Sequence, residues 1–492
     1  MSFESYSPYN GLLDEIAIFD RALSDAEILV AYMSAGSNPC GNVGSWVSCS
    51  RRTVWVTESE KSASVSVVFL RGTNAADLNF AVDYTTVDGN AHAGEDYVAA
   101  SGTLQFAAGE TNKQIAITIL DDALREPEEH FRLVLSNPTG GVSLGISNAI
   151  IRIRDDEPSY VNVNNPSPVF PYGSWATAAT KIQDAVDAAS PGTLVLVTNG
   201  VYRTGRVEAA GPNRVALTNQ VVLQSVNGPE VTVIDGGGSV RCVYVANSAV
   251  ISGFTLTNGA THGGLGWVSD EQGGGLFWDG GAAMASNCVL TGNSASSGGG
   301  AIGGILNNCT LVGNSASHGG GAFGSALYNC TLTGNSAGGL YGYGGGAWNS
   351  TLSDCTLVGN SASQGGGGAY DSSLYSSTLS CNLAPWGGGA SAGTLKNCTV
   401  TGNDGGGVTG WQQTTILNSI VYYNSGGNYD QSSTLNYCCT TPLPADGVGN
   451  ITLDPQLASA SHLSLFSPCR GAGSAAYATG TDIDGEAWAT PP

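Results

Sequence analysis

The feature that most constrains this chain is an internal repeat in its C-terminal half. The sequence Cys288-Val-Leu-Thr-Gly-Asn-Ser-Ala-Ser-Ser-Gly-Gly-Gly-Ala-Ile contains one complete unit. The unit starts again, intact or in weaker form, at Cys309, Cys330, Cys355, Cys381 and Cys398, with steps of 21, 21, 25, 26 and 17 residues. A step of about 21 residues suits one coil of a solenoid, and the variation in length fits in loops between coils. The repeat therefore predicts a parallel β-helix.

The pattern inside one unit indicates which side chains face the core of the coil. Alternation in a strand places the Cys and Leu of Cys-x-Leu inside and the intervening Thr or Val outside, so we expect the six cysteines to form a column of small buried side chains. The Gly-Asn pair predicts a ladder of side-chain amides at a bend. Its members are Asn293, Asn314, Asn335, Asn360 and Asn403. The glycine triplets permit tight corners with positive φ.

Composition limits the classes of partner. The chain has 492 residues, enough for two to four domains, and 39 acidic against 17 basic residues give a net charge of −22. Nucleic acids and anionic membranes need clustered Lys and Arg, so neither is expected as a partner. The excess of acid fits either binding of Ca²⁺ through oxygen ligands or simple solubility.

No apolar run approaches the ~20 residues that would cross a bilayer, so membrane insertion is not expected. The first residues also lack the basic and apolar regions of a signal peptide. The chain is then either cytosolic or an internal fragment of a longer protein. We expect a fragment of an extracellular or cell-surface protein, because both ends resemble parts of larger domains, as described next.

Residues 1–49 are too few for a domain. The stretch from Tyr9 to Ile28 contains Gly-Leu-Leu-Asp-Glu-Ile-Ala-Ile-Phe-Asp-Arg-Ala-Leu-Ser, a strand followed by a helix that Ser24 caps. It resembles the end of a laminin-G/concanavalin-like jelly roll, so residues 1–49 are interpreted as the C-terminal remnant of such a domain and a linker. Cys40 and Cys49 flank a short Gly/Ser/Val segment and could close a disulfide loop in an oxidising compartment.

Residues 50–157 alternate apolar and polar residues in about seven short runs, which is typical of a β-sandwich. Strands are expected at residues 65–69, 80–84, 114–119 and 131–135. The segment resembles the Calx-β family. The matching pieces lie at residues 83–97 (Asp-Tyr-Thr-Thr-Val-Asp-Gly-Asn-Ala-His-Ala-Gly-Glu-Asp-Tyr), 102–106, 109–111, 119–122, 128–131 and 155–157.

The resemblance implies a calcium site at one end of this sandwich. Carboxylates gathered at one end repel each other, and a hard cation with six to eight oxygen ligands relieves that repulsion. The implied metal ligands are Glu58, Asp88, Asp96, Asp121, Asp122, Asp155 and Asp156. The alternative is a Calx-β fold whose sites do not bind metal.

Residues 158–492 are expected to form the β-helix with its caps. Residues 175–189 place apolar residues on one helical face, and Pro191-Gly192 ends the helix before a strand at residues 193–197. This arrangement resembles the N-terminal cap of pectin-lyase-like β-helices of bacterial surface proteins, and residues 453–485 resemble their closing region. The expected fold class is all-β, a β-sandwich followed by a right-handed single-stranded parallel β-helix with a short N-terminal capping helix.

Bulky residues recur after the glycine triplets and form the predicted ligand-binding row. If the preceding alanines face inward, the bulky residues face outward and stack about 5 Å apart, one per coil. The row comprises Trp278, Ile302, Phe323, Trp348 and Tyr370, of which Trp278, Phe323, Trp348 and Tyr370 are the candidate ligand contacts. Such a row could stack on sugar rings of a polysaccharide or cell-surface glycan. The alternatives are burial in the core or self-association along the β-helix.

Catalysis has weaker support in the sequence. Between Cys242 and Cys469 there is no Arg and a single Lys, Lys396, which argues against uronate lyase chemistry. A hydrolase of neutral glycans needs two suitably spaced carboxyl groups, and Asp279 and Asp371 are the weak candidates. Three functions stay open: a calcium-binding adhesion or polysaccharide-contacting module, a carbohydrate-active enzyme using the β-helix groove, and a structural spacer or filament subunit.

Overall fold

The computed structural model describes residues 45–71, 78–122, 124–246, 248–261, 271–280, 283–410 and 414–478. The expected jelly-roll remnant at residues 1–39 and Cys40 lie outside these residues. The chain divides into two compact units, residues 1–157 and 158–492. Within the described residues, no helix is long and apolar enough to cross a membrane.

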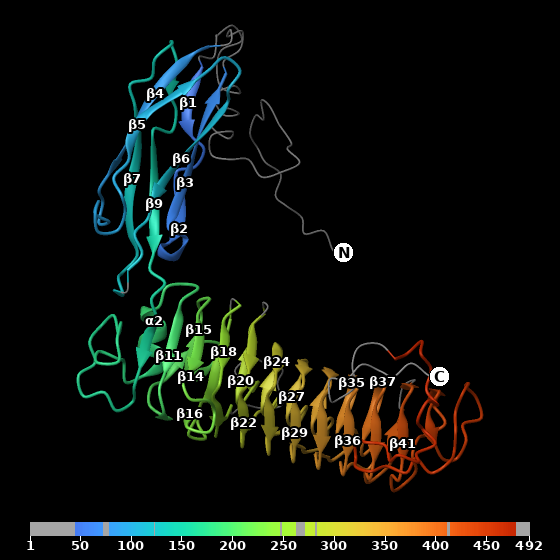
Figure 1. The fold of residues 1–492 in the computed structure, drawn as a ribbon. Helices are drawn as coiled ribbons and strands as arrows, with labels where there is room; N and C mark the ends of the chain where they lie inside the picture. The colour runs from blue at the N-terminus through green and yellow to red at the C-terminus, as the bar shows by residue number, and fades with distance from the viewer. Residues whose placement is uncertain are drawn as a thin grey trace, which may run out of the picture. The chain divides into compact units, whose positions relative to one another are not determined.

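The first unit is an antiparallel-rich β-sandwich of two sheets (Figure 1). One sheet has the order β6-β3-β1-β8 and the other β2-β9-β7-β4-β5. The strands are β1 (Trp46–Cys49), β2 (Thr53–Thr57), β3 (Ser62–Leu70), β4 (Phe80–Val87), β5 (Ser101–Phe106), β6 (Asn112–Thr118), β7 (Glu129–Ser136), β8 (Ser143–Leu144) and β9 (Asn148–Arg154), with a 3₁₀ helix η1 (Glu58–Glu60) after β2.

The four expected strands are confirmed as β3, β4, β6 and β7. Their alternation arises because one face of each strand packs against the opposite sheet, as the strictly alternating burial along β3 shows. The core contains two stacked aromatic pairs, Tyr97 with Phe131 and Phe80 with Phe106. The sandwich also starts earlier than expected, because β1 pairs with β3 and β8; residues 46–49 are therefore part of it and not of a linker.

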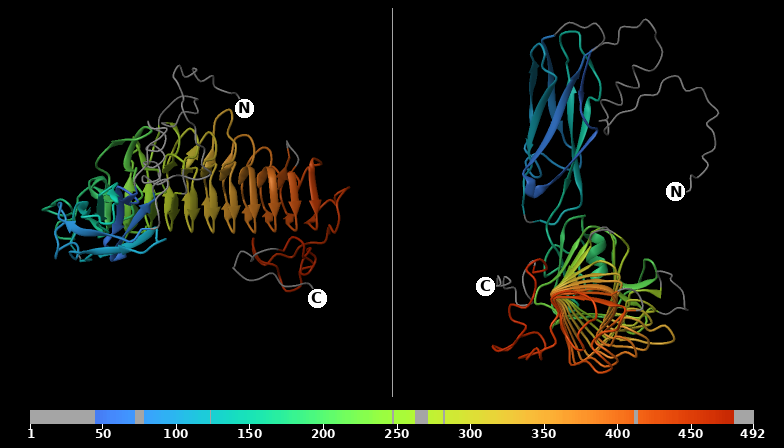
Figure 2. Two further views of the ribbon diagram at one scale, coloured as in Figure 1. Left: turned by 90° about the horizontal axis from the view of Figure 1, so that it is seen from above. Right: turned by 90° about the vertical axis from the view of Figure 1, so that its right-hand side faces the viewer.

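The second unit is a parallel β-helix (Figures 1 and 2). Among the described residues, its largest sheet has 20 strands. They are β10 (Ser159–Val161), β11 (Leu194–Val197), β13 (Val207–Glu208), β14 (Pro212–Leu217), β15 (Val222–Ser225), β17 (Arg241–Val245), β18 (Val250–Ser252), β20 (Leu276–Trp278), β21 (Met284–Ser286), β23 (Ala301–Ile302), β24 (Ile305–Asn307), β27 (Ala322–Phe323), β28 (Ala326–Tyr328), β31 (Ala347–Trp348), β32 (Thr351–Ser353), β35 (Ala369–Tyr375), β37 (Ala390–Lys396), β39 (Val408–Thr409), β40 (Thr414–Leu417) and β42 (Ser433–Asn436).

Two smaller sheets complete the coils. The 11-stranded sheet contains β12 (Gly200–Tyr202), β16 (Thr232–Asp235), β19 (Thr255–Thr257), β22 (Val289–Thr291), β25 (Thr310–Val312), β29 (Thr331–Thr333), β33 (Thr356–Val358), β36 (Thr378–Ser380), β38 (Thr399–Thr401), β41 (Ile420–Tyr422) and β43 (Cys439–Thr440). The three-stranded sheet contains β26 (Ser315–Ala316), β30 (Ser336–Ala337) and β34 (Ser361–Ala362). Equivalent residues of successive coils pair in register, so Leu290, Leu311 and Leu332 form one fully buried column.

The asparagine ladder is confirmed. Asn314 Nδ2 donates to Asn335 Oδ1 over 2.9 Å, and Asn335 donates in the same way to Asn360. Each amide also donates to a main-chain carbonyl, such as that of Leu311 for Asn335. The ladder includes Asn382, which the repeat comparison missed because its unit is degenerate.

Five of the six cysteines expected in the buried column do lie there. The prediction for Cys381 was wrong. Cys381 is exposed with φ of +54°, because the register aligns it with the corner glycines Gly359 and Gly402. Ser377 takes the column position instead, and its Oγ accepts a hydrogen bond from Cys355 N at 3.1 Å.

The capping helix is shorter than expected. It is α2 (Ile182–Ala188), whereas the sequence predicted a helix over residues 175–189. The expected apolar face is nevertheless buried, with Ala178, Ile182 and Val186 at most 2% exposed. The helix begins late because Ala179 bridges to Val161 in extended backbone, which holds the preceding residues against the first strand.

Candidate metal site

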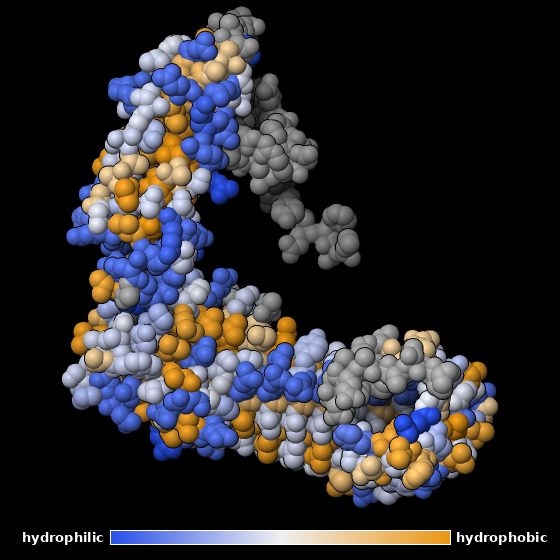
Figure 3. Space-filling model, in the orientation of Figure 1, coloured by the Kyte–Doolittle hydropathy of each residue, from blue (hydrophilic) through white to orange (hydrophobic). Residues whose placement is uncertain are grey.

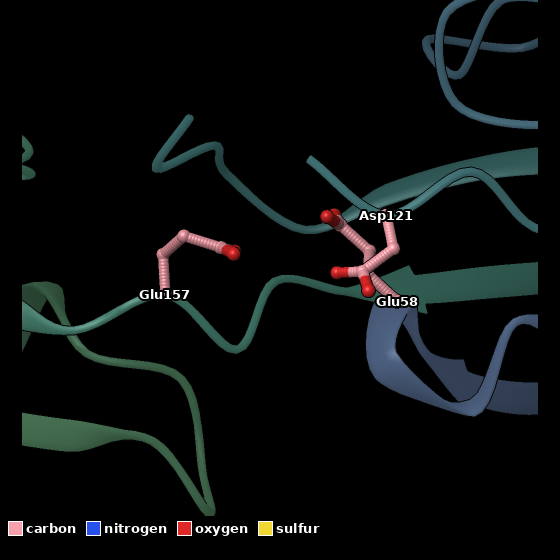
Figure 4. Close-up of side chains that lie close together, drawn as sticks. All are labelled: Glu58, Asp121 and Glu157. Atoms are coloured by element: carbon pink, nitrogen blue, oxygen red, sulfur yellow. The ribbon is translucent and has the colours of Figure 1, made fainter. Parts of the chain in front are cut away.

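Three carboxyl groups meet at one end of the sandwich, and we call them the first acidic cluster: Glu58, Asp121 and Glu157. Glu58 opens η1 after β2, Asp121 follows β6 and Glu157 follows β9. One oxygen of each lies within 4.8 Å of the others. In Figure 4 the carboxyl group of Glu157 points toward those of Glu58 and Asp121 from the opposite side. The strand ends of both sheets thus bring distant parts of the sequence together.

Two carboxyl groups of the first cluster have raised pKa values. Burial and the neighbouring charges of Glu157 and Asp155 raise the pKa of Glu58 to about 8. Burial, followed by the charge of Asp155, raises the pKa of Glu157 to about 7. The one cation bound to the cluster among the described residues is Lys61, whose Nζ lies 3.2 Å from Asp121 Oδ2 and is well exposed. Glu58 and Glu157 therefore hold protons near neutral pH.

A second acidic cluster contains Asp96, Glu126 and Glu129, again with one oxygen of each within 4.8 Å of the others. Burial raises the pKa of Glu129 to about 8, and a hydrogen bond with Asp96 adds to that rise. Burial and the charge of Asp96 also raise the pKa of Glu126. The charge of Glu126 in turn contributes to the raised pKa of Glu58, so the two clusters influence each other.

Asp155 forms an ion pair with Arg125 inside the sandwich. The Arg125 guanidinium binds Asp155 Oδ2, and both side chains are at most 2% exposed. Asp155 Oδ1 accepts a hydrogen bond from the backbone N–H of Glu126 at 2.7 Å. Both oxygens of this predicted ligand are therefore engaged by the protein itself.

The remaining predicted ligands lie outside the two clusters. Asp88 accepts hydrogen bonds from Ala93 N and the Tyr97 hydroxyl, and the Tyr97 bond holds the pKa of Asp88 below its usual value. Asp122 accepts from Leu124 N at 2.6 Å. Asp156 accepts from Ser59 N at 3.2 Å. All three order local backbone in this arrangement.

The donor set of both clusters fits calcium. Ca²⁺ takes oxygen ligands at about 2.3–2.6 Å, so ligand oxygens on one ion lie at most about 5 Å apart. The 4.8 Å limit within each cluster satisfies this condition without rearrangement of the strands. Glu58 is only 7% exposed, so little bulk water would compete with a cation for its carboxyl group.

Three cluster members were missed in the sequence: Glu126, Glu129 and Glu157. A signal was present for two of them, since Arg125-Glu-Pro-Glu-Glu129 is an acid-rich run that leads into β7, whose first residue is Glu129. Glu157 stands beside the predicted Asp155 and Asp156 in an Asp-Asp-Glu sequence. Which acid of such a run points inward depends on the loop conformation.

In the predicted ligand-binding row on the β-helix, the outward orientation expected for Trp278 is wrong. Register pairs Phe277, and not Trp278, with Ile302, so Trp278 faces the core and is 6% exposed. Phe323, Trp348 and Tyr370 do stack on successive coils, half-buried, with Ala322, Ala347 and Ala369 facing inward. Their rings meet edge to face, at 80° and 89°, so the row is not a flat ridge.

The two candidate catalytic acids are not brought together. Asp279 follows β20, whereas Asp371 lies in β35, and four coil steps separate Phe277 from Tyr370 in the register. At about 4.8 Å per coil this is roughly 19 Å, beyond the ~5–9.5 Å that a glycosidase pair needs. Asp279 instead accepts a hydrogen bond from the Tyr244 hydroxyl at 2.7 Å.

The first unit is a β-sandwich that gathers acidic residues from both sheets at one end. Residues 42–157 match the family model described as the Calx-beta domain, and this segment is a Calx-β domain. The second unit is a parallel β-helix.

Similar proteins are known for each unit. Sodium/calcium exchanger 2 of Rattus norvegicus is 48% identical over 67 residues, which are 14% of this chain and only 7% of the exchanger. A crystal structure of the apo-form Calx CBD1 domain is 32% identical, with a TM-score of 0.22, and covers 23% of this chain and 99% of that chain. The A-module of the Azotobacter vinelandii mannuronan C-5 epimerase is 17% identical, with a TM-score of 0.33, and covers 56% of this chain and 81% of that chain.

Proposed function

We propose that this chain is a calcium-binding part of a secreted or cell-surface multidomain protein. The observation that carries the proposal is the first acidic cluster, in which Glu58 is nearly buried beside two further carboxyl groups. Such a cluster is unfavourable when ionised, and a divalent cation would relieve the repulsion. Bound Ca²⁺ would join η1, the end of β6 and the exit of β9, and so stiffen this end of the sandwich.

Calcium titration by calorimetry tests the proposal. The full chain, stripped of metal, should bind Ca²⁺, and Glu58→Gln should weaken the first-cluster ion roughly tenfold or more by removing one ligand charge. Asp96→Asn should weaken an ion at the second cluster and leave the first-cluster ion bound. Glu110→Gln is the matched control, because Glu110 lies in the β5–β6 turn and pairs with Lys113 of β6. The proposal fails if the unmodified chain binds no calcium or if Glu58→Gln titrates like Glu110→Gln.

The β-helix supports a second candidate function, contact with a neutral polysaccharide or cell-surface glycan. Phe323, Trp348 and Tyr370 form a half-buried aromatic row, and Tyr343 packs 4.6 Å from Tyr370. Aromatic faces stack on sugar rings, and the scarcity of cations on these coils favours an uncharged glycan. Retention on glycan arrays should fall for Tyr370→Ala and stay unchanged for Tyr375→Ala, an exposed tyrosine of the same strand. Equal retention of the two variants would remove this candidate.

A further inference from the structure

The C-terminal segment, defined here as residues 453–478, leaves the last coil and folds back along the solenoid (Figure 2, left). Ser474 N donates to Asn418 Oδ1 over 2.7 Å, and Asn397 Nδ2 donates to the Tyr477 carbonyl over 3.0 Å. Few apolar side chains anchor it, since Leu465 and Phe466 are 71% and 81% exposed. The C-terminal coils show hydrophobic residues among hydrophilic ones in Figure 3. Polar contacts alone would hold such a segment weakly.

Two thiols meet where this segment leaves the solenoid. Cys439, in β43, donates through Sγ to the Leu453 carbonyl at 3.2 Å. Cys469 N donates to Ser467 Oγ at 3.2 Å, and that hydroxyl binds the carbonyl of Pro455, two residues from Leu453. These bonds bring both cysteines to the same short stretch, where their side chains lie in contact.

The two thiols differ in access and in acidity. Cys439 is 4% exposed, whereas Cys469 is partly exposed to solvent. Contact with the Cys439 side chain lowers the pKa of the Cys469 thiol, and the same contact raises the pKa of Cys439. Cys469 is therefore the sulfur that an external reagent meets first.

The cysteine column does not offer an equivalent pair. Cys309 and Cys330 are 1% exposed and lie in register on neighbouring coils. Main-chain ladder bonds on both sides hold the coils at a spacing of about 4.8 Å, whereas the Cβ atoms of a disulfide are about 3.8 Å apart. Cys469 lies in a turn outside the strands, so its backbone can adjust.

We infer that Cys439 and Cys469 form a disulfide bond that fastens the C-terminal segment to the last coil. The oxidant is a small disulfide or a disulfide-donating oxidoreductase, as an oxidising compartment supplies. Cys469, losing its proton, attacks one oxidant sulfur and releases the other as a thiol. Cys439, losing its proton, then attacks the mixed disulfide, which releases the second thiol. Two electrons and two protons pass to the oxidant, and the new bond encloses residues 440–468.

Thiol mapping of the full chain tests this inference. The folded protein is incubated with oxidised glutathione, its free thiols are alkylated in denaturant, and the digest is analysed by mass spectrometry. We expect one cross-linked peptide pair containing Cys439 and Cys469, with the column cysteines fully alkylated. Cys438 is the internal control, because its Sγ points into the core toward the Ile416 carbonyl.

Two variants make the test decisive. Cys469→Ser should abolish the cross-link, leave Cys439 open to alkylation and speed protease cleavage within residues 453–478 at least several-fold. Cys381→Ser removes another exposed thiol and should leave the cross-link intact. The inference is overturned if both cysteines are alkylated after oxidation of the folded protein, or if Cys469 pairs with Cys438. It is also overturned if the protease rate does not depend on oxidation.

Discussion

Asp155 is a carboxylate whose charge is balanced inside the protein. Arg125 and the Glu126 amide engage its two oxygens, and its negative charge still contributes to the raised pKa values of Glu58 and Glu157. Arg125 thus acts as a fixed counter-ion at the acidic end, next to the clusters proposed to bind calcium. A buried pair of this kind is costly to break, because removing one partner leaves a desolvated charge.

Arg125→Met should destabilise the calcium-free sandwich by about 3–5 kcal/mol, since it leaves Asp155 buried without its cation. Added calcium should recover part of that loss by supplying another cation nearby. Urea unfolding with chelator and with calcium measures both effects. Arg152→Met is the matched control, because Arg152 pairs with Glu128 at the surface, and such pairs contribute only about 0–1 kcal/mol. Equal effects of the two variants would contradict the assignment.

The raised carboxyl pKa values predict an unusual pH dependence. Glu58, Glu129 and Glu157 have folded-state pKa values of about 8, 8 and 7, against about 4.3 in an unfolded chain. Their protonated forms are therefore favoured by folding, so this stability is present below about pH 4.3 and is lost as pH rises through 7–8. Calcium should reverse the trend, since it binds the ionised groups.

In calcium-free buffer, the thermal midpoint of the sandwich should fall by about 5 °C or more between pH 5 and 8, the effect of roughly 1 kcal/mol in a small domain. Carboxyl groups with lowered pKa values, such as Asp83 and Asp88, stay ionised across this window and do not mask the effect. Glu58→Gln, which cannot ionise, should flatten the profile. A thermal midpoint that rises steadily from pH 5 to 8 would show that protonation of the two acidic clusters does not stabilise the folded sandwich.

At the scale of elements, the asparagine ladder explains why short strands suffice in the β-helix. Most strands of the regular coils have two or three residues, so each corner needs its own hydrogen bonds. Asn335 accepts at Oδ1 from Asn314 N and Nδ2, and donates to Leu311 O and Asn360 Oδ1. The side chain is 0% exposed, so its partners have no water to replace it.

Asn335→Ala should therefore cost the β-helix about 3 kcal/mol or more, because several buried donors and acceptors lose their partner at about 1–3 kcal/mol each. Thr333→Ala, an outward-facing change in the same coil, should stay within about 0.5 kcal/mol. Chemical unfolding of the second unit, followed by far-UV circular dichroism, measures both. A loss for Asn335→Ala as small as that for Thr333→Ala would mean that the ladder adds little stability.

The β-helix could be predicted well from the sequence, because the core and corner residues recur at the same positions in every coil. Leu311 and Asn314 could be placed from their spacing alone, since in-register stacking preserves each position. The errors fall where the repeat degenerates. Cys381 resembles a repeat start but stands at a glycine corner. Trp278 stands one position beyond the row, because Leu276 takes the alanine position after the glycine triplet and Phe277 takes the row position.

The acidic site was predictable only in part. The family resemblance located the acidic end, and Glu58, Asp96 and Asp121 do lie in the two clusters. It could not reveal that Arg125 binds Asp155, because that pair depends on how the loop before β7 folds. Alternation fixes the direction of a side chain within a strand, but it gives no information in the loops, where most of these acids lie.

At the scale of the whole molecule, the two units depend on different interactions. The sandwich places its charge at one end, whereas the β-helix distributes its stability over stacked coils with few charges. A ligand that binds the folded form of one unit stabilises that unit by mass action. Calcium should therefore act on the sandwich without directly stabilising the coils.

Scanning calorimetry of the full chain should accordingly resolve two transitions, of which calcium shifts only one. At a free calcium concentration of 100 times the dissociation constant, the stabilisation is about 2.7 kcal/mol, which raises the midpoint of a domain of this size by roughly 10 °C. The shifted transition should be the one that Arg125→Met lowers, and the other should be the one that Asn335→Ala lowers. Equal calcium shifts in both transitions would show that the two units unfold as one cooperative body.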